Sequence, residues 1–145
     1  MTCPIDTGVL LRAFDGTSRD YRAIRQALRT LWTRQERLVV ALQNIAEFWN
    51  VSTRPVDKNG YGLSTERASR RLTVVERVCD LVTEDDDSYQ VWKGLVVTHA
   101  VTGVAVHGAR LVSVMLSHGI STIVTLNAQD FRRYSGISAV TPSEV

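Results

Sequence analysis

The stretch Cys3-Pro4-Ile5-Asp6-Thr7-Gly8-Val9-Leu10-Leu11 opens the chain and decides its fold. It is typical of a short buried strand that ends at an acid, with Asp6 at the point where a first strand gives way to a first helix. In an open α/β sheet, ligands bind outside the carboxyl ends of the strands, so a carboxylate at this point can meet a metal or a substrate. Aspartate is also a favoured helix cap, and capping of a helix over 9–14 is the competing interpretation.

The composition is that of an ordinary globular protein, with 145 residues, 44% of them hydrophobic and 22% charged. This length is expected to form a single domain over residues 1–145 with a sizeable core. The net charge of +2 is too small to indicate nucleic-acid binding by itself. The two cysteines form no metal-binding pattern. The sequence also has no apolar run of the ~20 residues that span a membrane and no export signal. These features predict a cytoplasmic protein that does not associate with membranes.

Short apolar runs alternate with helical patterns along the rest of the chain. Strands are predicted over 37–42, 121–126 and 137–140, because continuous apolar or β-branched runs are typical of strands buried in a parallel sheet. Helices are predicted from apolar residues at i, i+3, i+4 and i+7, over 21–35, 44–51, 64–82, 88–102 and 106–119. This alternation predicts an α/β fold, a three-layer α/β/α sandwich with a mostly parallel central sheet.

Polar residues mark several helix ends. Asp20, Asn44 and Ser64 are expected N-caps, and Gly119 is an expected C-terminal stop. The acidic run over 84–87 is expected to cap the next helix, because adjacent acids repel and no calcium-loop spacing accompanies them.

The helix predicted over 21–35 has two unlike faces. Trp32 belongs to its apolar stripe, and Arg22, Arg25 and Arg29 lie on the opposite face at helical spacing. Such a row of arginines can meet RNA phosphates or an acidic partner peptide. The alternative is an ordinary solvated face.

Three acids, Asp6, Glu47 and Asp130, each follow the carboxyl end of a predicted strand. The three carboxylates are expected to lie at the same edge of the sheet, where they can bind a metal ion directly or through water. Capping or the helix dipole explains each acid singly but does not explain why all three share this position. No phosphate-binding loop is present, so nucleotide hydrolysis is not expected.

The chain resembles the PIN-domain family, and within it the VapC-type toxins of toxin–antitoxin pairs. The resemblance covers essentially the whole chain and rests on four motifs: Asp6-Thr7 after the first strand, the stretch over 44–51 with Glu47-Phe48, His107-Gly108-Ala109-Arg110-Leu111, and the stretch over 125–131 with Asp130. It implies a metal-dependent endoribonuclease that uses Mg²⁺ or Mn²⁺, cleaves RNA, forms a homodimer and is neutralised by a cognate antitoxin protein. Asp6, Glu47 and Asp130 are then the catalytic metal ligands, and Thr7, Asn127 and His107 orient them or contact substrate.

Position 108 departs from the family pattern, because Gly108 stands where the family carries aspartate. Gly8 also stands where such proteins often carry asparagine or serine. Since Mg²⁺ often uses only one or two carboxylates plus waters, three acids still suffice for one ion. The expected protein is therefore a ribonuclease weakened or inactivated at position 108, either naturally or because the active protein harms its host. A non-catalytic PIN-like module that binds antitoxin or RNA is the alternative, and a flavodoxin-like receiver or nucleotide-binding domain ranks third.

Overall fold

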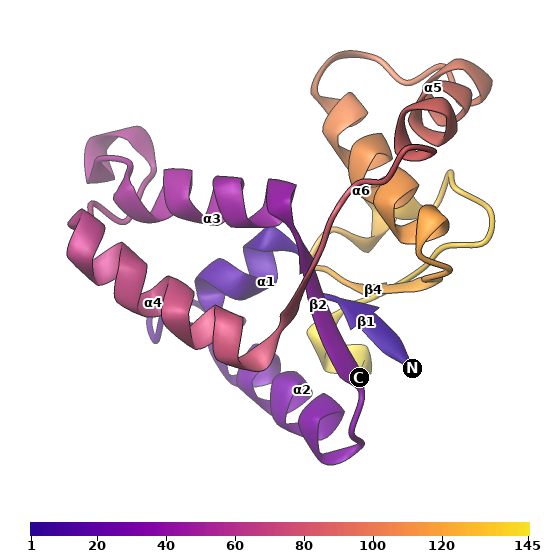
Figure 1. Ribbon diagram of the computed structural model, residues 1–145. Coiled ribbons are helices and arrows are strands. Elements are labelled where there is room, and N and C mark those ends of the chain that lie inside the picture. The colour runs from indigo at the N-terminus through magenta and orange to yellow at the C-terminus, as the bar shows by residue number, and fades with distance from the viewer.

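The computed structural model describes residues 1–145 as a parallel sheet with helices on both faces (Figure 1). Strands β1 (Thr2–Pro4), β2 (Arg37–Ala41) and β3 (Asp80–Val82) pair in the order β1-β2-β3, and β4 (Thr122–Val124) pairs with β5 (Ser138–Val140). Every pairing is parallel, and a bridge between Ile5 and Val124 joins the two parts. The predicted α/β/α sandwich is confirmed, with the strands in the order β3-β2-β1-β4-β5.

Each face of the sheet has its own hydrophobic core, because successive residues of a strand point to opposite faces. Leu38 and Val40 of β2 pack with α1 (Thr7–Arg12), α2 (Tyr21–Thr33), α3 (Leu42–Thr53) and α4 (Thr65–Val78). Val39 and Ala41 pack on the other face with α5 (Ser88–Thr98) and α6 (Val106–Ser117). Figure 1 shows these two groups of helices on opposite sides of β2.

The connections contain four short 3₁₀-helices, over Val56–Lys58, Gly103–Ala105, Ala128–Phe131 and Pro142–Glu144. Because all strands run in the same direction, their carboxyl ends meet at one edge of the sheet. The residues that follow β1, β2 and β4 are therefore brought together there. None of the helices is both long enough and apolar enough to cross a membrane.

The periodicity predicts a single helix over 64–82, but the structure divides this segment into a helix and a strand. Helix α4 ends at Val78, Cys79 takes an extended backbone, and the next three residues form the edge strand β3. Pairing with β2 supplies the hydrogen bonds that a longer helix would otherwise make. Cys79 is buried and lies between the two elements rather than within the helix.

The helix caps follow the predictions only in part. Ser64 accepts a hydrogen bond from the Arg67 N–H at 3.2 Å and is confirmed as the N-cap of α4. Asn44 lies inside the first turn of α3, where its side chain accepts from the Ala41 N–H at 3.2 Å. Asp20 precedes α2 without making a side-chain cap bond. Asp20 is therefore the N-cap residue of α2, as predicted, although its side chain makes no cap bond. The prediction for Asn44 was wrong, because α3 begins at Leu42 and its N-cap is Ala41.

Two surface predictions differ from the structure. Asp87 of the acidic run is the N-cap residue of α5, but its side chain makes no cap bond. Asp85 accepts hydrogen bonds from the Asp87 N–H and the Ser88 hydroxyl, so it orders the turn before α5 rather than capping the helix. Trp32, expected on the apolar stripe of α2, is 62% exposed. Ile24 and Leu31 of the same helix belong to the core and Trp32 does not, so Trp32 lies outside the buried face of α2.

Candidate active site

Asp6 and Glu47 are joined through Thr7 at the carboxyl edge of the sheet. Asp6 is the N-cap of α1, and its Oδ1 accepts the Thr7 N–H at 2.9 Å. The Thr7 hydroxyl donates to Glu47 Oε2 at 2.8 Å, from the start of α1 across to α3. Asp6 therefore caps a helix and also contributes to a pair of neighbouring acids, so the two interpretations of this residue are compatible.

Two buried polar side chains fix this pair in position. The Thr125 hydroxyl, just after β4, donates to Asp6 Oδ2 at 2.7 Å. The Asn44 amide donates to the Thr7 hydroxyl at 3.0 Å and lies 3.4 Å from Asp6 Oδ1. Thr125 and Asn44 are fully buried, so each needs these partners to satisfy its polar atoms. Together they hold the Asp6 carboxylate in one orientation.

The electrostatic environment of Asp6 is unfavourable for its charged form. Burial raises the pKa of Asp6, hydrogen bonds from Thr125 and the Thr7 N–H oppose this, and the nearby carboxylates of Glu47 and Asp130 raise the pKa further. Asp130, although exposed on the 3₁₀-helix after β4, is thus close enough to act on Asp6 through space. A bound cation relieves both the burial and the repulsion of such carboxylates.

Gln43 is a residue of this site that the motifs do not indicate. Its Nε2 donates to the His107 carbonyl at 2.9 Å and lies 3.4 Å from Glu47 Oε1, which connects α3 to the first turn of α6. Since both neighbours only accept hydrogen bonds, the orientation of the amide is fixed. Its Oε1 is buried without a hydrogen-bond partner. The spacing of four residues between Gln43 and Glu47, one helical turn, is the signal that places them on one face.

The remaining predicted residues contribute fewer side-chain contacts to the site. His107 is exposed and contributes its backbone carbonyl rather than its ring. Asn127 is exposed, and its backbone N–H donates to the Thr125 hydroxyl at 3.1 Å. A Cβ at Gly108 meets no atom within 4 Å, so packing does not require glycine there. A Cβ at Gly8 lies 3.3 Å from Arg12 Nη1, the mobile end of a long side chain.

The donors of this site suit a hard divalent cation by chemistry. No group of three or more His, Cys, Asp or Glu side chains in the chain is arranged to hold a metal ion. Asp6 and Glu47 nevertheless supply two neighbouring carboxylates, both bonded to Thr7. Mg²⁺ commonly takes one or two carboxylates and fills its other positions with water, so this pair fits one hydrated ion.

Comparison with known proteins identifies the fold. No family model matches the sequence, and no curated protein matches it. The structure is similar to VapBC-1 from nontypeable Haemophilus influenzae, with a TM-score of 0.75, 12% identity and 99% of each chain covered. It is also similar to VapBC2 from Rickettsia felis, which was solved bound to a DNA fragment from its promoter, with a TM-score of 0.72, 13% identity, and 97% and 98% of the two chains covered.

A further similar structure is VapC20 from Mycobacterium tuberculosis, a toxin that cleaves the sarcin–ricin loop. Its TM-score is 0.59 at 15% identity, and the match covers 83% of this chain and 86% of that one. At such identities the likeness establishes the fold. The chain has the PIN-like fold of VapC toxins, as its motifs predict.

Proposed function

We propose that this protein is a metal-dependent endoribonuclease, the toxin of a toxin–antitoxin pair, with activity weakened by Gly108. The observation that carries the proposal is the pair of carboxylates, Asp6 and Glu47, held together by Thr7 at the carboxyl edge of a PIN-like sheet. The similar VapC20, a toxin that cleaves the sarcin–ricin loop, supports the choice of RNA as substrate.

The roles of the residues follow from their contacts. A bound Mg²⁺ or Mn²⁺ supplies polarisation of the phosphate and activation of water. Asp6 and Glu47 are the proposed ligands, with Asp130 acting directly or through water. Thr125 and Asn44 keep Asp6 in one orientation, and Gln43 holds Glu47 against the first turn of α6. Asn127 and His107 are both exposed, and their proposed role is to contact RNA rather than to bind the ion.

Gly108 explains why activity should be low. It lies in the first turn of α6, next to the carbonyl that Gln43 contacts, and there is open space where a side chain would begin. An aspartate there would add an oxygen donor near a helix N-terminus, where the dipole favours an anion. Without it, the metal is held by one carboxylate fewer, so we expect weak metal affinity and slow cleavage.

The test compares the protein with Gly108→Asp and Gly108→Asn on single-stranded RNA in Mn²⁺. We expect Gly108→Asp to cleave at least ~10-fold faster, which corresponds to about 1.4 kcal/mol of barrier, and EDTA to abolish the gain. Gly108→Asn has a similar shape without the charge and should leave the rate low. Asp6→Asn should abolish cleavage in either background, and calorimetry should show weaker Mn²⁺ binding to it.

Two results would change the interpretation. Equal acceleration by asparagine and aspartate would mean that position 108 acts through helix structure, because glycine in a helix costs about 1 kcal/mol relative to alanine. Absence of cleavage by every variant would favour the second candidate, a non-catalytic module that binds antitoxin or RNA. The specific observation that favours this second candidate is that no three acidic, histidine or cysteine side chains are grouped to hold a metal ion.

We also propose an antitoxin partner and a homodimer. A groove between the ends of α2 and α4, with a volume of about 390 Å³, is lined by Arg25, Leu28, Arg29, Trp32, Thr33 and Val78. An exposed indole flanked by arginines suits an acidic peptide with apolar side chains that orders on binding. Sedimentation of the isolated protein tests the homodimer, and a monomer at micromolar concentration would contradict it.

A further inference from the structure

Arg12 is the last residue of α1, but its guanidinium lies beside the first turn of that helix. Its Nη1 donates to the Gly8 carbonyl at 3.3 Å. A Cβ at Gly8 would lie 3.3 Å from this nitrogen and 3.7 Å from Leu126 Cδ1. Gly8 and Leu126 each follow a threonine that donates a hydrogen bond to Asp6. The guanidinium therefore lies at the carboxyl edge of the sheet, beside the candidate active site.

The helix dipole does not explain this position of the Arg12 guanidinium. A cation is favourable at the end of a helix and unfavourable at its start, where the free N–H groups point outward. Arg12 belongs to the last turn of α1, yet its side chain runs back to the first turn. Long helical side chains commonly take this direction, so no strain is involved. The position is suited to an anion at the carboxyl edge of the sheet.

No acid of the protein pairs with Arg12. The four ion pairs of the structure involve the N-terminus and three other arginines. Asp15, three residues further along the chain, is the nearest acid in sequence, but it accepts hydrogen bonds from Thr17 and Tyr61 instead. Nε and Nη2 of Arg12 have no hydrogen-bond partner in the protein and are not buried. These two nitrogens are therefore available to a ligand.

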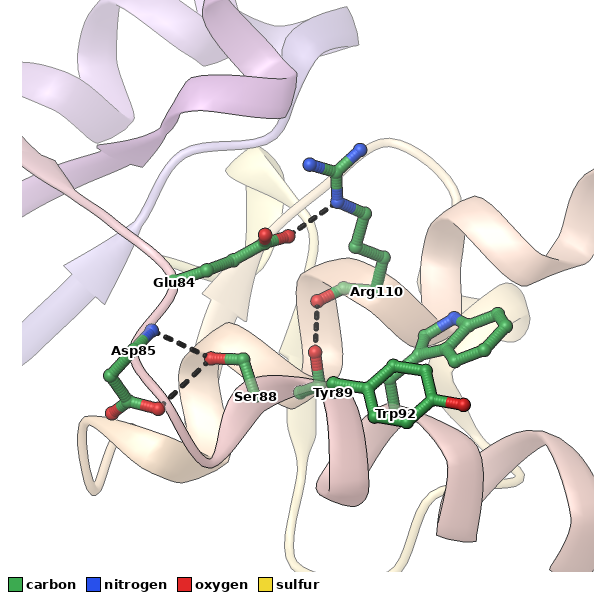
Figure 2. A pocket seen from close by; sticks show the side chains of 7 residues that line it. Glu84, Asp85, Ser88, Tyr89, Trp92 and Arg110 are labelled. Atoms are coloured by element: carbon green, nitrogen blue, oxygen red, sulfur yellow. Dashed lines mark hydrogen bonds and ion pairs between the residues drawn. The ribbon is translucent and has the colours of Figure 1, made fainter.

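Arg110 of α6 is a second arginine near the site, but its charge is already paired. It lines a cavity of about 50 Å³ together with Gln43. Figure 2 shows its Nε bonded to the carboxylate of Glu84. A ligand of Arg110 therefore has to compete with Glu84, whereas a ligand of Arg12 has no such competitor.

The neighbouring acids indicate which anion Arg12 binds. Asp6 and Glu47 suit a divalent cation, and divalent cations and arginines act together on the oxygens of phosphate groups. The planar guanidinium keeps donors for a phosphate after one nitrogen has been used. A carboxylate of an acidic peptide is the competing ligand. Such a peptide also needs apolar contacts, and Arg12 does not line the groove beside Trp32 that offers them.

We propose that Arg12 binds a phosphate of the RNA backbone at the candidate active site, and that Gly8 leaves room for its guanidinium. This proposal rests on the proposed function, since it takes RNA as the ligand. It adds a residue that contacts the backbone of the RNA rather than the metal ion. A larger side chain at position 8 would begin 3.3 Å from Nη1 and would displace the guanidinium. The contact depends neither on the identity of the base nor on a bound metal.

The experiment measures binding of a fluorescein-labelled, 2′-O-methyl oligoadenylate to the full-length protein in EDTA, over a series of KCl concentrations. Cleavage and metal binding then play no part. We expect Arg12→Gln to weaken binding ~10-fold at low salt and to reduce the slope of log K against log[KCl] by about 0.7, the contribution of one phosphate contact with a single strand. Arg12→Lys keeps the charge and should keep the slope.

Arg34→Gln is the matched control, because it removes the same charge at the opposite edge of the sheet. Arg34 lies between α2 and the start of β2, is exposed and forms no ion pair. This variant should keep the slope of the unchanged protein. Gly8→Leu should weaken RNA binding as Arg12→Gln does, and should weaken it no further in the Arg12→Gln background. Thermal unfolding of each variant checks that it is folded.

Three results would overturn the proposal. An unchanged slope in Arg12→Gln, with a lower melting temperature, would mean that the guanidinium only offsets the charge of the acids. An equal reduction of the slope in Arg34→Gln would mean that any positive charge attracts RNA to the same extent. Normal RNA binding by Arg12→Gln, with loss of a co-expressed antitoxin, would make Arg12 a protein contact.

The proposed function and the phosphate contact fail in different ways. If no variant at position 108 cleaves RNA but Arg12→Gln reduces the slope, the ribonuclease is rejected and the phosphate contact stands. If Gly108→Asp cleaves RNA and the further change Arg12→Gln alters neither cleavage nor the slope, the phosphate contact alone is rejected.

Discussion

Thr7 joins the acids of the candidate site through a single hydroxyl group. That hydroxyl donates to Glu47 and accepts from Asn44, while the Thr7 N–H donates to the Asp6 carboxylate. Valine has nearly the same shape but offers neither a donor nor an acceptor. Thr7→Val therefore leaves the buried Asn44 amide and the Glu47 carboxylate short of one partner each.

We expect Thr7→Val to lower the free energy of unfolding by about 1–3 kcal/mol at pH 7 and to weaken Mn²⁺ binding. Urea denaturation and calorimetry measure the two effects. Thr7→Ser keeps the hydroxyl and should lose much less of either. If the valine and serine variants behave alike, the methyl group rather than the hydrogen bonds supports the site.

The two cysteines are predicted to be unreactive while the protein is folded. Burial raises the pKa of Cys3 to about 11 and the pKa of Cys79 to about 12, in each case with a smaller contribution from a nearby acid. Only the thiolate is an effective nucleophile. At pH 8 both thiols should resist a disulfide reagent such as Ellman's reagent and react fully in urea.

The same pKa shifts predict the pH dependence of stability. The folded thiols hold their protons more tightly than unfolded ones, so their contribution is complete below the ordinary thiol pKa of about 8.5 and is lost as pH rises through 11 and 12. The free energy of unfolding should therefore fall between pH 9 and 11, and less steeply in Cys79→Ala. An equal slope in both proteins would mean that other groups cause the fall.

Among the elements, the edge strand β3 could not be predicted, because the apolar pattern of the preceding helix continues through it. One apolar stripe at helical spacing runs through this part of the sequence, although the backbone becomes extended at Cys79. Its members are Ala68, Leu72, Val75, Cys79 and Val82. A three-residue strand is too short to show its own alternation, and Leu81 is 53% exposed. The strands buried on both faces were predictable from composition, whereas this one depends on pairing with β2.

The candidate site was predictable in position but not in detail. Parallel strands end at one edge, so the neighbourhood of Asp6, Glu47 and Asp130 follows from topology. Which polar groups link them depends on side-chain geometry: Asn44 was expected to cap a helix, yet it also supports Thr7. The spacing of four residues between Gln43 and Glu47 predicts that they share one face of a helix. The contact of Gln43 with the His107 carbonyl joins residues far apart in the chain and was not predictable.

The cap of α4 provides a matched test of local stability. Ser64 makes a side-chain cap bond to the Arg67 N–H, whereas Asp20 makes none at the start of α2. We expect Ser64→Ala to lower the free energy of unfolding by about 1 kcal/mol. Asp20→Ala should change it by less than ~0.5 kcal/mol, as for ordinary surface positions. Equal losses in urea denaturation would mean that the cap bond does not determine the stability of α4.

At the scale of the whole molecule, opposite charges occupy different regions. The carboxylates of Asp6, Glu47 and Asp130 gather at the carboxyl edge of the sheet. Arg22, Arg25 and Arg29 are exposed on α2, so the small net charge of +2 conceals a basic surface. The groove beside the exposed ring of Trp32, lined by Arg25 and Arg29, is the surface that we propose for the antitoxin.

Co-expression with the product of the neighbouring short reading frame tests whether an antitoxin binds this groove. We expect a stable complex with the unchanged protein. Trp32→Ala and Arg29→Glu should each reduce co-purification at least ~10-fold, because the first removes the largest apolar contact and the second repels an acidic peptide.

Val104→Ser is the control for surface hydrophobicity in general. Val104 is 85% exposed in the connection between α5 and α6, on the other side of the sheet from α2. Its replacement should leave the complex intact if the groove between α2 and α4 is the docking surface. Loss of the complex in Val104→Ser, with retention in Trp32→Ala and Arg29→Glu, would move the antitoxin to the face covered by α5 and α6.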